Sequence, residues 1–503
     1  MLFPARRSLL LLLAASPLCA CAKRPDGPNI LVITLDTTRR DHLGMYGYPL
    51  PTSPNLDRLA KDALVYTNAY AVSSWTMPTH ASMFTGKFPS SHGAQYDPDG
   101  PLNLGSGIGA QFGAYRARPI AENEITLAML LAEEGYETAG IIAGPWMLKQ
   151  FRLGKGFEHY DDSGVSALNG RPAADVTRAA IEYVDEHADD PFFLFLNYYD
   201  PHSPWFEEPA RDAEGKVVGQ PKPFQDLTPV FPKSGMISDY TEFANVCYDA
   251  EIRYMDREIG RLLDHLKSNG LYEKTWIFVL ADHGELMGEP VLGETGLWGH
   301  GDSLTEPEIH IPFLVKEPGP NARTGTDASF VQQTDLLPTI CARLGIALPP
   351  NVQGTPLGQQ HDVISELVKL PMMNRTDGPN PKDWRHLGNW VVLVEGKNKF
   401  GWSENGTHTL VDLAADPLER TNLYEARKAE ADDKMEGLLA YLTQLPRPGA
   451  TGEVEELDDA TQDALKGLGY VGDDDEPRPN VHPAAQPPKE EPAVDEGGAA
   501  PKE

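Results

Sequence analysis

One segment indicates how this chain folds: Trp276-Ile277-Phe278-Val279-Leu280-Ala281-Asp282-His283-Gly284-Glu285. Its apolar run is typical of a strand that is buried on both faces of a parallel sheet. Asp282 and His283 follow that strand directly, and both side chains are metal ligands. Open α/β sheets place their chemistry at the carboxyl ends of such strands. We therefore expect a functional site at Asp282 and His283.

The same pattern occurs near the N-terminus, where the apolar run 29–35 is followed by Asp36. Between the two runs, Thr76 stands at a predicted helix start, because Pro78 suits the first turn of a helix. We expect Asp36, Thr76, Asp282 and His283 to form one site. A metal beside the Thr76 hydroxyl would lower its pKa and make it a nucleophile toward phosphorus or sulfur. Carboxylate and imidazole together favour Zn²⁺ or Mn²⁺, while Ca²⁺ prefers oxygen ligands.

Strand and helix patterns alternate along the chain, which predicts an α/β fold with a doubly wound, mostly parallel sheet and helices on both faces. The predicted strands are 29–35, 138–142, 192–197 and 275–280, and the predicted helices are about 54–62, from about 78, 126–135, 173–187, 243–268 and 333–344. The runs 390–394 and 409–413 are separated by glycines, so we expect antiparallel strands there, in a small C-terminal α+β subdomain.

The predicted domains are a catalytic domain at 22–350, a C-terminal subdomain at 351–470 that completes the fold, and a disordered acidic tail at 471–503. A short helix is expected near 458–467, and the tail has too few apolar residues to fold. The stretches 97–120 and 205–240 are long for structureless loops. Loops of that length are often functional, so we expect them to cover the active site.

Residues 1–21 are typical of a bacterial lipoprotein signal, with a basic start, an apolar core and Leu18-Cys19-Ala20-Cys21 at the cleavage zone. The apolar core is too short to span a bilayer. We expect export from the cytoplasm and a lipid anchor at Cys21, so that the protein faces the periplasm or the cell exterior. The alternative is an ordinary secretory signal that contains cysteine by chance.

The chain has 503 residues and a formal net charge of −31. Residues 453–503 hold 15 acidic and 4 basic residues, so about −20 remains for the rest of the chain. Such an acidic protein repels nucleic acid, and we expect no nucleic-acid partner. Cys247 and Cys341 lie in apolar, helix-like surroundings, which favours two buried thiols over a disulfide.

Several motifs follow one another from Pro28 to Leu423: Pro28-Asn29-Ile30 with Asp36, Thr52-Ser53-Pro54-Asn55-Leu56-Asp57, Thr76-Met77-Pro78-Thr79-His80-Ala81-Ser82 with Thr85-Gly86, Asp200-Pro201-His202, Asp282-His283-Gly284-Glu285, Gly299-His300-Gly301, Asp335-Leu336-Leu337-Pro338-Thr339, and Asp416-Pro417 with Asn422-Leu423. In sequence and order these motifs resemble the sulfatase family of the alkaline phosphatase superfamily. The resemblance implies an alkaline phosphatase-like fold. It also implies a metal shell of Asp36, Thr76, Asp282 and His283, with Thr76 as nucleophile, and contacts from His202 and His300 to the transferred anionic group.

The departures from the family pattern bear on the reaction. Sulfatases that use formylglycine have Cys or Ser, then x-Pro-x-Arg, where this chain has Thr76 and His80. Threonine cannot become formylglycine, so none is expected. Thr37 replaces the second acid, His283 replaces the usual Asn, and Gly144-Pro145-Trp146-Met147 replaces Gly-Lys-Trp-His. These changes are similar to the phosphoesterase and phosphotransferase branches, which favours phosphorus as the reacting atom, or a sulfatase that works by direct threonine attack.

Three assignments stay open at this stage. His80 either holds Thr76 in place or acts as a general acid for the leaving group. Arg39 and Arg40 either form structural ion pairs or neutralise charge near the metal. His202 is either a contact to the transferred group or an ordinary loop histidine, and the further alternative is that Asp200, His202 and His300 hold a second metal, as in two-metal phosphatases.

The sequence therefore predicts a hydrolase of sulfate or phosphate esters that uses one divalent metal ion, Zn or Mn favoured and Ca possible, and a covalent Thr76 intermediate. The substrate would be a small molecule or a glycan or lipid ester. One alternative is a phosphotransferase that acts on an envelope lipid or glycan. The other is a lipoprotein binding module without catalysis, which the intact set of metal-binding residues argues against.

Overall fold

The computed structural model describes residues 27–97, 99–106, 114–165, 170–203, 240–292, 297–301, 303–368, 389–404, 406–452 and 457. The predicted signal with Cys21, most of the 205–240 stretch, the helix near 458–467 and the acidic tail lie outside these residues. None of the helices in the described part combines the length and the apolar character needed to cross a membrane.

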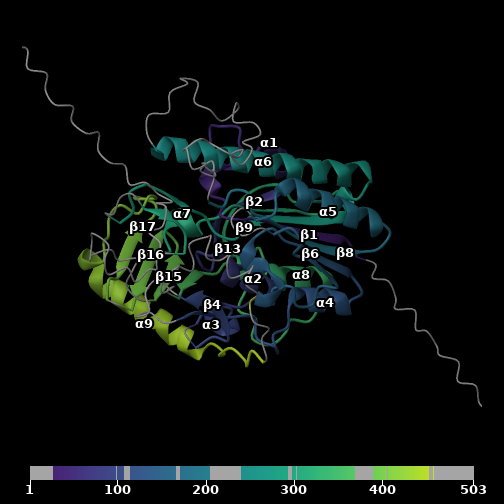
Figure 1. Ribbon diagram of the computed structural model, residues 1–503. Helices are drawn as coiled ribbons and strands as arrows, with labels where there is room; N and C mark the ends of the chain where they lie inside the picture. Colours follow the sequence, from purple (N-terminus) through teal and green to yellow (C-terminus); the bar gives the residue numbers. More distant parts are fainter. Residues whose placement is uncertain are drawn as a thin grey trace, which may run out of the picture.

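A central sheet of eight strands forms the body of the molecule (Figure 1). From edge to edge the order is β13 (Gly325–Gln332), β2 (Leu64–Tyr70), β12 (Phe313–Lys316), β9 (Thr275–Ala281), β1 (Asn29–Leu35), β8 (Phe192–Tyr198), β6 (Glu137–Ile141) and β7 (His159–Asp161). Every neighbouring pair is parallel except the two that involve β12. The predicted, mostly parallel sheet is therefore confirmed.

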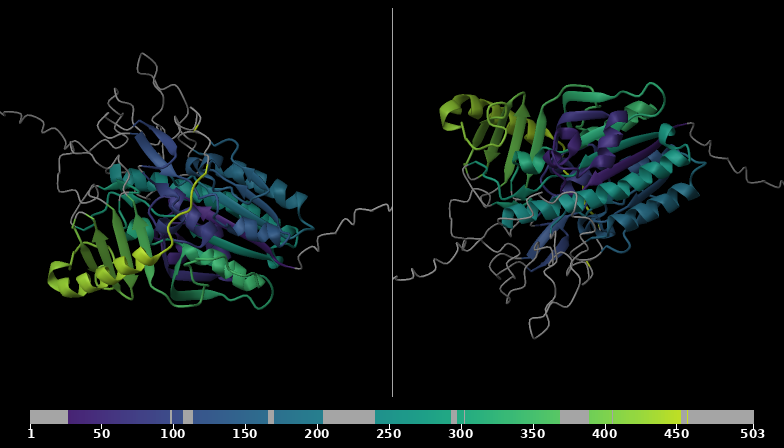
Figure 2. Two further views of the ribbon diagram at one scale, coloured as in Figure 1. Left: turned by 90° about the horizontal axis from the view of Figure 1, so that it is seen from below. Right: turned by 90° about the horizontal axis from the view of Figure 1, so that it is seen from above.

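Helices cover both faces of this sheet, as a doubly wound fold requires (Figures 1 and 2). Successive side chains of a strand point to opposite faces. Accordingly Ile30 and Val32 of β1 join one core, and Leu31 and Ile33 join the other. The first core includes α2 (Thr76–Thr85), α4 (Leu127–Glu133) and α8 (Leu336–Leu344), and the second includes α1 (Pro54–Leu59), α5 (Ala173–Glu186) and α6 (Tyr240–Ser268).

The C-terminal part is a second sheet that packs beside the first, with one long helix across it (Figure 1). Its antiparallel strands are β14 (Val363–Leu367), β15 (Trp390–Glu395), β16 (Asn398–Ser403) and β17 (Thr409–Asp412), and the helix is α9 (Lys428–Gln444). The predicted antiparallel C-terminal subdomain is confirmed. Its domain boundaries remain a prediction.

The structure corrects the sequence expectations at one stretch. Residues 97–120 were expected to be loop, but β4 (Leu102–Ser106) and β5 (Ala114–Arg118) pair there with β3 (Gln95–Tyr96) in a small sheet. Their glycines and polar residues hide the strand pattern. Further short elements are α3 (Pro89–His92), α7 (Glu306–Ile309), β10 (Leu286–Met287) and β11 (Trp298–Gly299). Cys247 and Cys341 are both buried and free, as predicted.

Candidate active site

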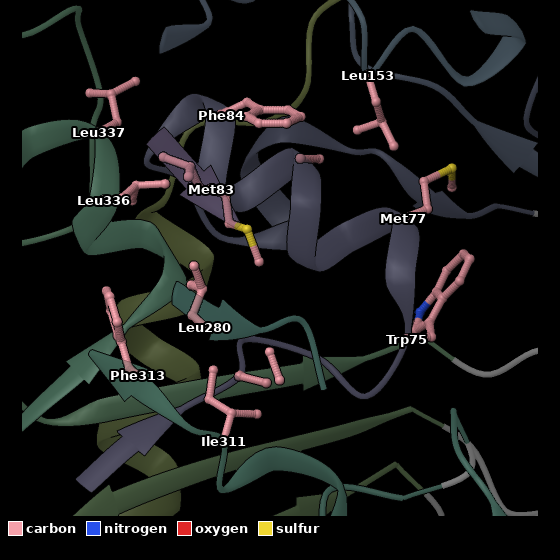
Figure 3. Packing of buried hydrophobic residues seen from close by; sticks show 14 of the residues in the cluster. Trp75, Met77, Met83, Phe84, Leu153, Leu280, Ile311, Phe313, Leu336 and Leu337 are labelled. Atoms are coloured by element: carbon pink, nitrogen blue, oxygen red, sulfur yellow. The ribbon is translucent and has the colours of Figure 1, made fainter. Parts of the chain in front are cut away.

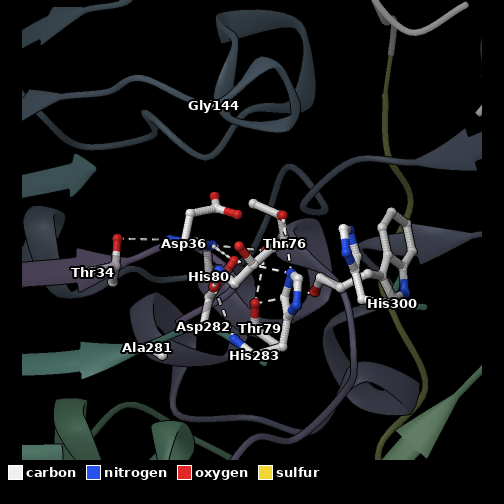
Figure 4. Close-up of polar contacts among 12 residues, drawn as sticks. Thr34, Asp36, Thr76, Thr79, His80, Gly144, Ala281, Asp282, His283 and His300 are labelled. Carbon is white, nitrogen blue, oxygen red and sulfur yellow. Dashed lines mark hydrogen bonds and ion pairs between the residues drawn. The ribbon is translucent and has the colours of Figure 1, made fainter. Parts of the chain in front are cut away.

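The two predicted carboxylates meet because their strands are neighbours. β1 and β9 pair in parallel, with Leu35 opposite Ala281, so Asp36 and Asp282 both follow the paired ends. The ligand atoms of Asp36, Asp282 and His283 lie within 4.8 Å of one another, and all three residues are buried (Figure 4). Residues more than two hundred positions apart therefore form one potential metal site.

Thr76 reaches this site from the first residue of α2. The residue before it, Trp75, has extended backbone angles, so the helix begins at the nucleophile candidate. All of α2 is buried, and its Met77, Met83 and Phe84 side chains pack into the core (Figure 3). Thr76 Oγ1 lies 3.4 Å from His283 Nε2. A helix that is fixed by its packing thus presents a hydroxyl to the metal-ligand group.

The electrostatics of the group suit a cation. Burial and the neighbouring Asp282 raise the pKa of Asp36 well above its usual range, because two carboxylates repel each other away from water. Within the described part of the chain, Asp36 Oδ1 and Asp282 Oδ2 are buried and accept no hydrogen bond. A divalent cation would satisfy both oxygens and offset the repulsion. The residues present therefore fit a metal.

His283 is prepared as a neutral ligand. Burial lowers its pKa to about 4, so the ring is uncharged at neutral pH. Its Nδ1 lies 2.9 Å from the Gly284 carbonyl oxygen, which can only accept, so Nδ1 carries the proton. The lone pair is then on Nε2, which lies 3.3 Å from Asp282 Oδ2. The hydrogen bond to Gly284 thus aims the ligand nitrogen into the site.

Two supporting residues were missed by the sequence reasoning. Asn197, at the end of β8, donates from Nδ2 to Asp36 Oδ2 at 3.3 Å and accepts the Gly144 N–H at 2.8 Å. Gln333 donates to the Asp282 carbonyl oxygen at 2.6 Å. An amide that ends an apolar strand is a signal that could have found Asn197. Gln333 does not follow an apolar run that ends in a polar residue, so no comparable sequence signal indicates it.

Thr37 and His80 occupy positions where the family pattern is broken. Thr37 has a left-handed backbone (φ 51°) and donates its N–H to Asp282 Oδ1 at 3.1 Å. The fully buried His80 bonds through Nδ1 to the Thr76 carbonyl oxygen at 2.8 Å and through Nε2 to Thr34 Oγ1 at 3.1 Å. Burial lowers the pKa of His80, so the ring is neutral. The His80 ring thus links the first residue of α2 to Thr34 of β1.

The other two predicted histidines lie beside the metal-ligand group. The His300 ring is 4.5 Å from the His283 ring and 4.8 Å from the His202 ring, measured between centroids. His300 Nδ1 lies 3.0 Å from the buried Glu285 Oε2, and His202 stacks on Tyr199 at 4.4 Å. The structure therefore places His300 against His283 and His202 against His300.

Arg39, Arg40 and Asp200 have other partners in the structure. Arg39 pairs with Asp41 at 2.7 Å and with Glu289, and it donates to the Glu285 carbonyl oxygen. Arg40 bonds to the Thr67 carbonyl oxygen and His310. One oxygen of Asp200 accepts the Ala173 N–H at the start of α5. In the described ranges, Asp36, Asp282 and His283 form a metal-ligand group, and Asp200, His202 and His300 do not form a second.

Comparisons with known proteins show the family and the fold. The family described as Sulfatase matches residues 28–346. An ulvan-active sulfatase of Formosa agariphila is 27% identical over 83% of this chain and 82% of its own. An N-acetylglucosamine-6-O-sulfatase of Bacteroides thetaiotaomicron is 23% identical over 87% and 90%. The crystal structure of a phosphonate monoester hydrolase of Agrobacterium radiobacter shares the fold, with a TM-score of 0.57, 20% identity, and coverage of 83% and 96%.

Proposed function

The chain belongs to the sulfatase family of the alkaline phosphatase superfamily and is a sulfuric ester hydrolase; from this premise we propose that hydrolysis depends on one divalent metal and on attack by Thr76. The observation that carries the proposal is the 3.4 Å distance between Thr76 Oγ1 and His283 Nε2, beside two buried carboxylates. Asp36, Asp282 and His283 would hold the metal together with Thr76. When bound, the ion would lower the pKa of the threonine hydroxyl and polarise the ester.

The residues around Thr76 support nucleophilic attack. Thr76 Oγ1 gives its proton to water and forms the new bond to sulfur or phosphorus while the bond to the ester oxygen breaks, and the leaving oxygen takes a proton from water. A second water then attacks the sulfur or phosphorus, the bond to Thr76 Oγ1 breaks, and the hydroxyl is restored. His80 fixes the backbone of Thr76 through its carbonyl oxygen. That contact favours a positioning role for His80 over a role as general acid. We propose that His202 and His300 contact the oxygens of the transferred group, which the 4.5 Å between the His300 and His283 rings and the 4.8 Å between the His300 and His202 rings support.

The charge of the site favours a reacting group with one negative charge. Asp36, Asp282 and Glu285 are buried there. Arg39 is neutralised by Asp41 and Glu289, and Pro145 stands where the family has lysine. A dianionic phosphate monoester would meet this charge with less compensation than a sulfate ester, a phosphodiester or a phosphonate monoester. We therefore propose a singly charged sulfuryl or phosphoryl ester as the substrate.

A substrate panel tests the reaction and the charge rule together. Aryl sulfate, diaryl phosphate, aryl phosphonate and aryl phosphate share a leaving group and differ in their charge and central atom. With purified protein and added Zn²⁺ or Mn²⁺, the three monoanions should react with higher kcat/KM than the dianion. N-acetylglucosamine 6-sulfate extends the panel to a sugar ester, which the N-acetylglucosamine-6-O-sulfatase relative supports. Higher kcat/KM for the dianion would refute the charge rule, and activity without metal would refute the metal requirement.

We also propose that the enzyme works outside the cytoplasm, anchored by a lipid on Cys21. The support is the Leu18-Cys19-Ala20-Cys21 sequence after a basic and apolar start. Mass spectrometry of the membrane fraction should find a mature chain that begins at acylated Cys21. A soluble exported chain with unmodified Cys21 would contradict this.

A further inference from the structure

One motif of the sequence analysis has no part in the site described above: Asp416-Pro417, followed by Asn422-Leu423. Glu419 lies between these pairs, in the loop after β17. It is buried, and its backbone has φ 51°, a left-handed conformation that side chains other than glycine rarely adopt. Such a conformation persists where surrounding contacts hold it. The contacts of Glu419 therefore indicate what this segment does.

Glu419 forms a buried ion cluster with a lysine of the C-terminal sheet. Lys399 of β16 is 3% exposed, and its Nζ lies 2.8 Å from Glu419 Oε1 and 3.0 Å from Glu306 Oε1. Glu419 Oε2 also accepts the backbone N–H of Glu306 at 2.6 Å. Glu306 is the first residue of α7, which lies within the predicted catalytic domain at 22–350. The cluster thus ties the C-terminal sheet to the start of α7.

α7 in turn holds the loop that follows the metal ligands. The N–H of Gly284 donates to the Glu308 carbonyl oxygen at 2.7 Å, and the N–H of Glu285 donates to the Pro307 carbonyl oxygen at 3.2 Å. The approach is so close that a Cβ on Gly284 would lie 2.0 Å from the Pro307 oxygen. Because His283 bonds to the Gly284 carbonyl oxygen, the position of this loop sets the direction of the ligand nitrogen.

We propose that Lys399 and Glu419 are positioning residues of the metal site: the C-terminal sheet holds α7, and α7 fixes the loop that follows Asp282 and His283. The inference rests on the proposed metal-dependent function. Stability alone is a weak reason for such a cluster, since burying charges removes their hydration and a buried ion pair often contributes little net stability. A cluster that links two subdomains at one defined geometry is suited to fixing a position.

The test compares two lysines of the same hairpin. Lys399→Met removes the buried charge, and Lys397→Met is the matched control, because Lys397 is 61% exposed and pairs with Asp412 at the surface. Hydrogen exchange is measured on the metal-free full-length chain. With Lys399→Met, the amides of Gly284 and Glu285 should exchange at least tenfold faster than in the wild type, while the core of β9 is unchanged. Lys397→Met should leave both regions unchanged.

Metal affinity supplies the second readout. Zn²⁺ and Mn²⁺ titrations of the metal-free protein should show at least tenfold weaker binding with Lys399→Met, near wild-type binding with Lys397→Met, and partial recovery with Lys399→Arg. A uniform rise in exchange across β9 and the loop would show that Lys399 only stabilises the fold, and it would overturn the proposal. Unchanged exchange or unchanged metal affinity in Lys399→Met would overturn it as well.

The variant could fail to fold, or the wild type could fail to bind metal, and each outcome has its own interpretation. If Lys399→Met does not fold, the double variant Lys399→Met/Glu419→Gln removes one charge of each sign, and the same criteria apply to it. If the wild type binds neither metal, the proposed function fails. The exchange of Gly284 and Glu285 then still decides whether the C-terminal sheet positions this loop.

Discussion

Gly284→Ala is the most direct perturbation of the site that leaves every ligand in place. Gly284 follows His283, and its backbone presses against α7. An added Cβ would lie 2.0 Å from the Pro307 carbonyl oxygen, whereas real Cβ atoms essentially never approach a heavy atom closer than 3.0 Å. The loop or α7 therefore has to move by at least 1.0 Å, taken as the difference of these two distances. The obstacle is backbone, so no flexible side chain can rotate away.

A displacement of that size has a calculable consequence. Moving catalytic groups by about 1 Å lowers rates by roughly 100-fold, which corresponds to about 2.7 kcal/mol of lost transition-state stabilisation. Overpacking a core also costs about 1–3 kcal/mol of stability. We therefore expect kcat/KM of Gly284→Ala to fall roughly 100-fold on the best substrate of the panel, with only a moderate decrease in Tm.

The assay measures kcat/KM at saturating metal, together with the melting temperature. Gly437→Ala is the matched control, since Gly437 lies in α9 and a Cβ there meets nothing within 4 Å. Alanine in a helix is favoured over glycine by about 0.5–1 kcal/mol, so this control should be active and slightly more stable. If kcat/KM of Gly284→Ala lay within about twofold of the wild-type value, the contact between α7 and the metal-ligand loop would not determine activity, and the prediction would be refuted.

Three further predictions concern the nucleophile, a metal ligand and pH. Thr76→Ala should abolish turnover in a folded protein while Thr76→Ser keeps a fraction, because serine has the hydroxyl without the methyl group that restricts its rotamers; near-normal activity of Thr76→Ala would contradict a covalent intermediate. Asp282→Ala should lose activity that excess metal partly restores, and activity equal to wild type at limiting metal would argue against its role as a ligand. Burial raises the pKa of Glu366 from 4.5 to about 7, so the folded state holds this proton more tightly than the unfolded state and stability falls as pH rises from 4.5 to 7. Between pH 4.5 and pH 8 the wild type should lose about 3 kcal/mol of unfolding free energy in urea unfolding, and Glu366→Gln should not lose it. The same loss in Glu366→Gln would show that another group causes it.

The fold was predictable where the apolar patterns are long and continuous. The run 29–35 coincides with β1, and the pattern at 173–187 matches α5 to within one residue. The strands β2, β12 and β13 were not predicted. β13 is an edge strand whose first residues are mostly exposed, and β12 has four residues, so neither leaves a sufficient apolar pattern. Their order in the sheet depends on tertiary pairing, which local patterns do not contain.

The site was predictable as a set of residues but not as an arrangement. Their positions after apolar runs or at a helix start predict Asp36, Thr76, Asp282 and His283 as site residues. The residues that support this set could not be predicted in the same way. Gln333, for example, bonds through its side-chain amide to the backbone carbonyl oxygen of Asp282. Such contacts require only that two loops meet, and they leave no spacing or periodicity in the sequence. His80 shows the same limit: its alternative roles could be compared only when both partners of its ring were known.

The part of the chain that supports the active site extends beyond the segment that matches the family. The match ends at residue 346, before the C-terminal sheet begins at β14. Yet Glu306, inside the matched segment, is buried with its carboxylate against Lys399 and its N–H on Glu419, both of which lie beyond it. A chain that ended at residue 346 would leave this carboxylate without its lysine and the first N–H of α7 without its acceptor. Since α7 holds the loop that follows Asp282 and His283, the C-terminal sheet is better understood as a support of that loop, acting through α7, than as an appended subdomain.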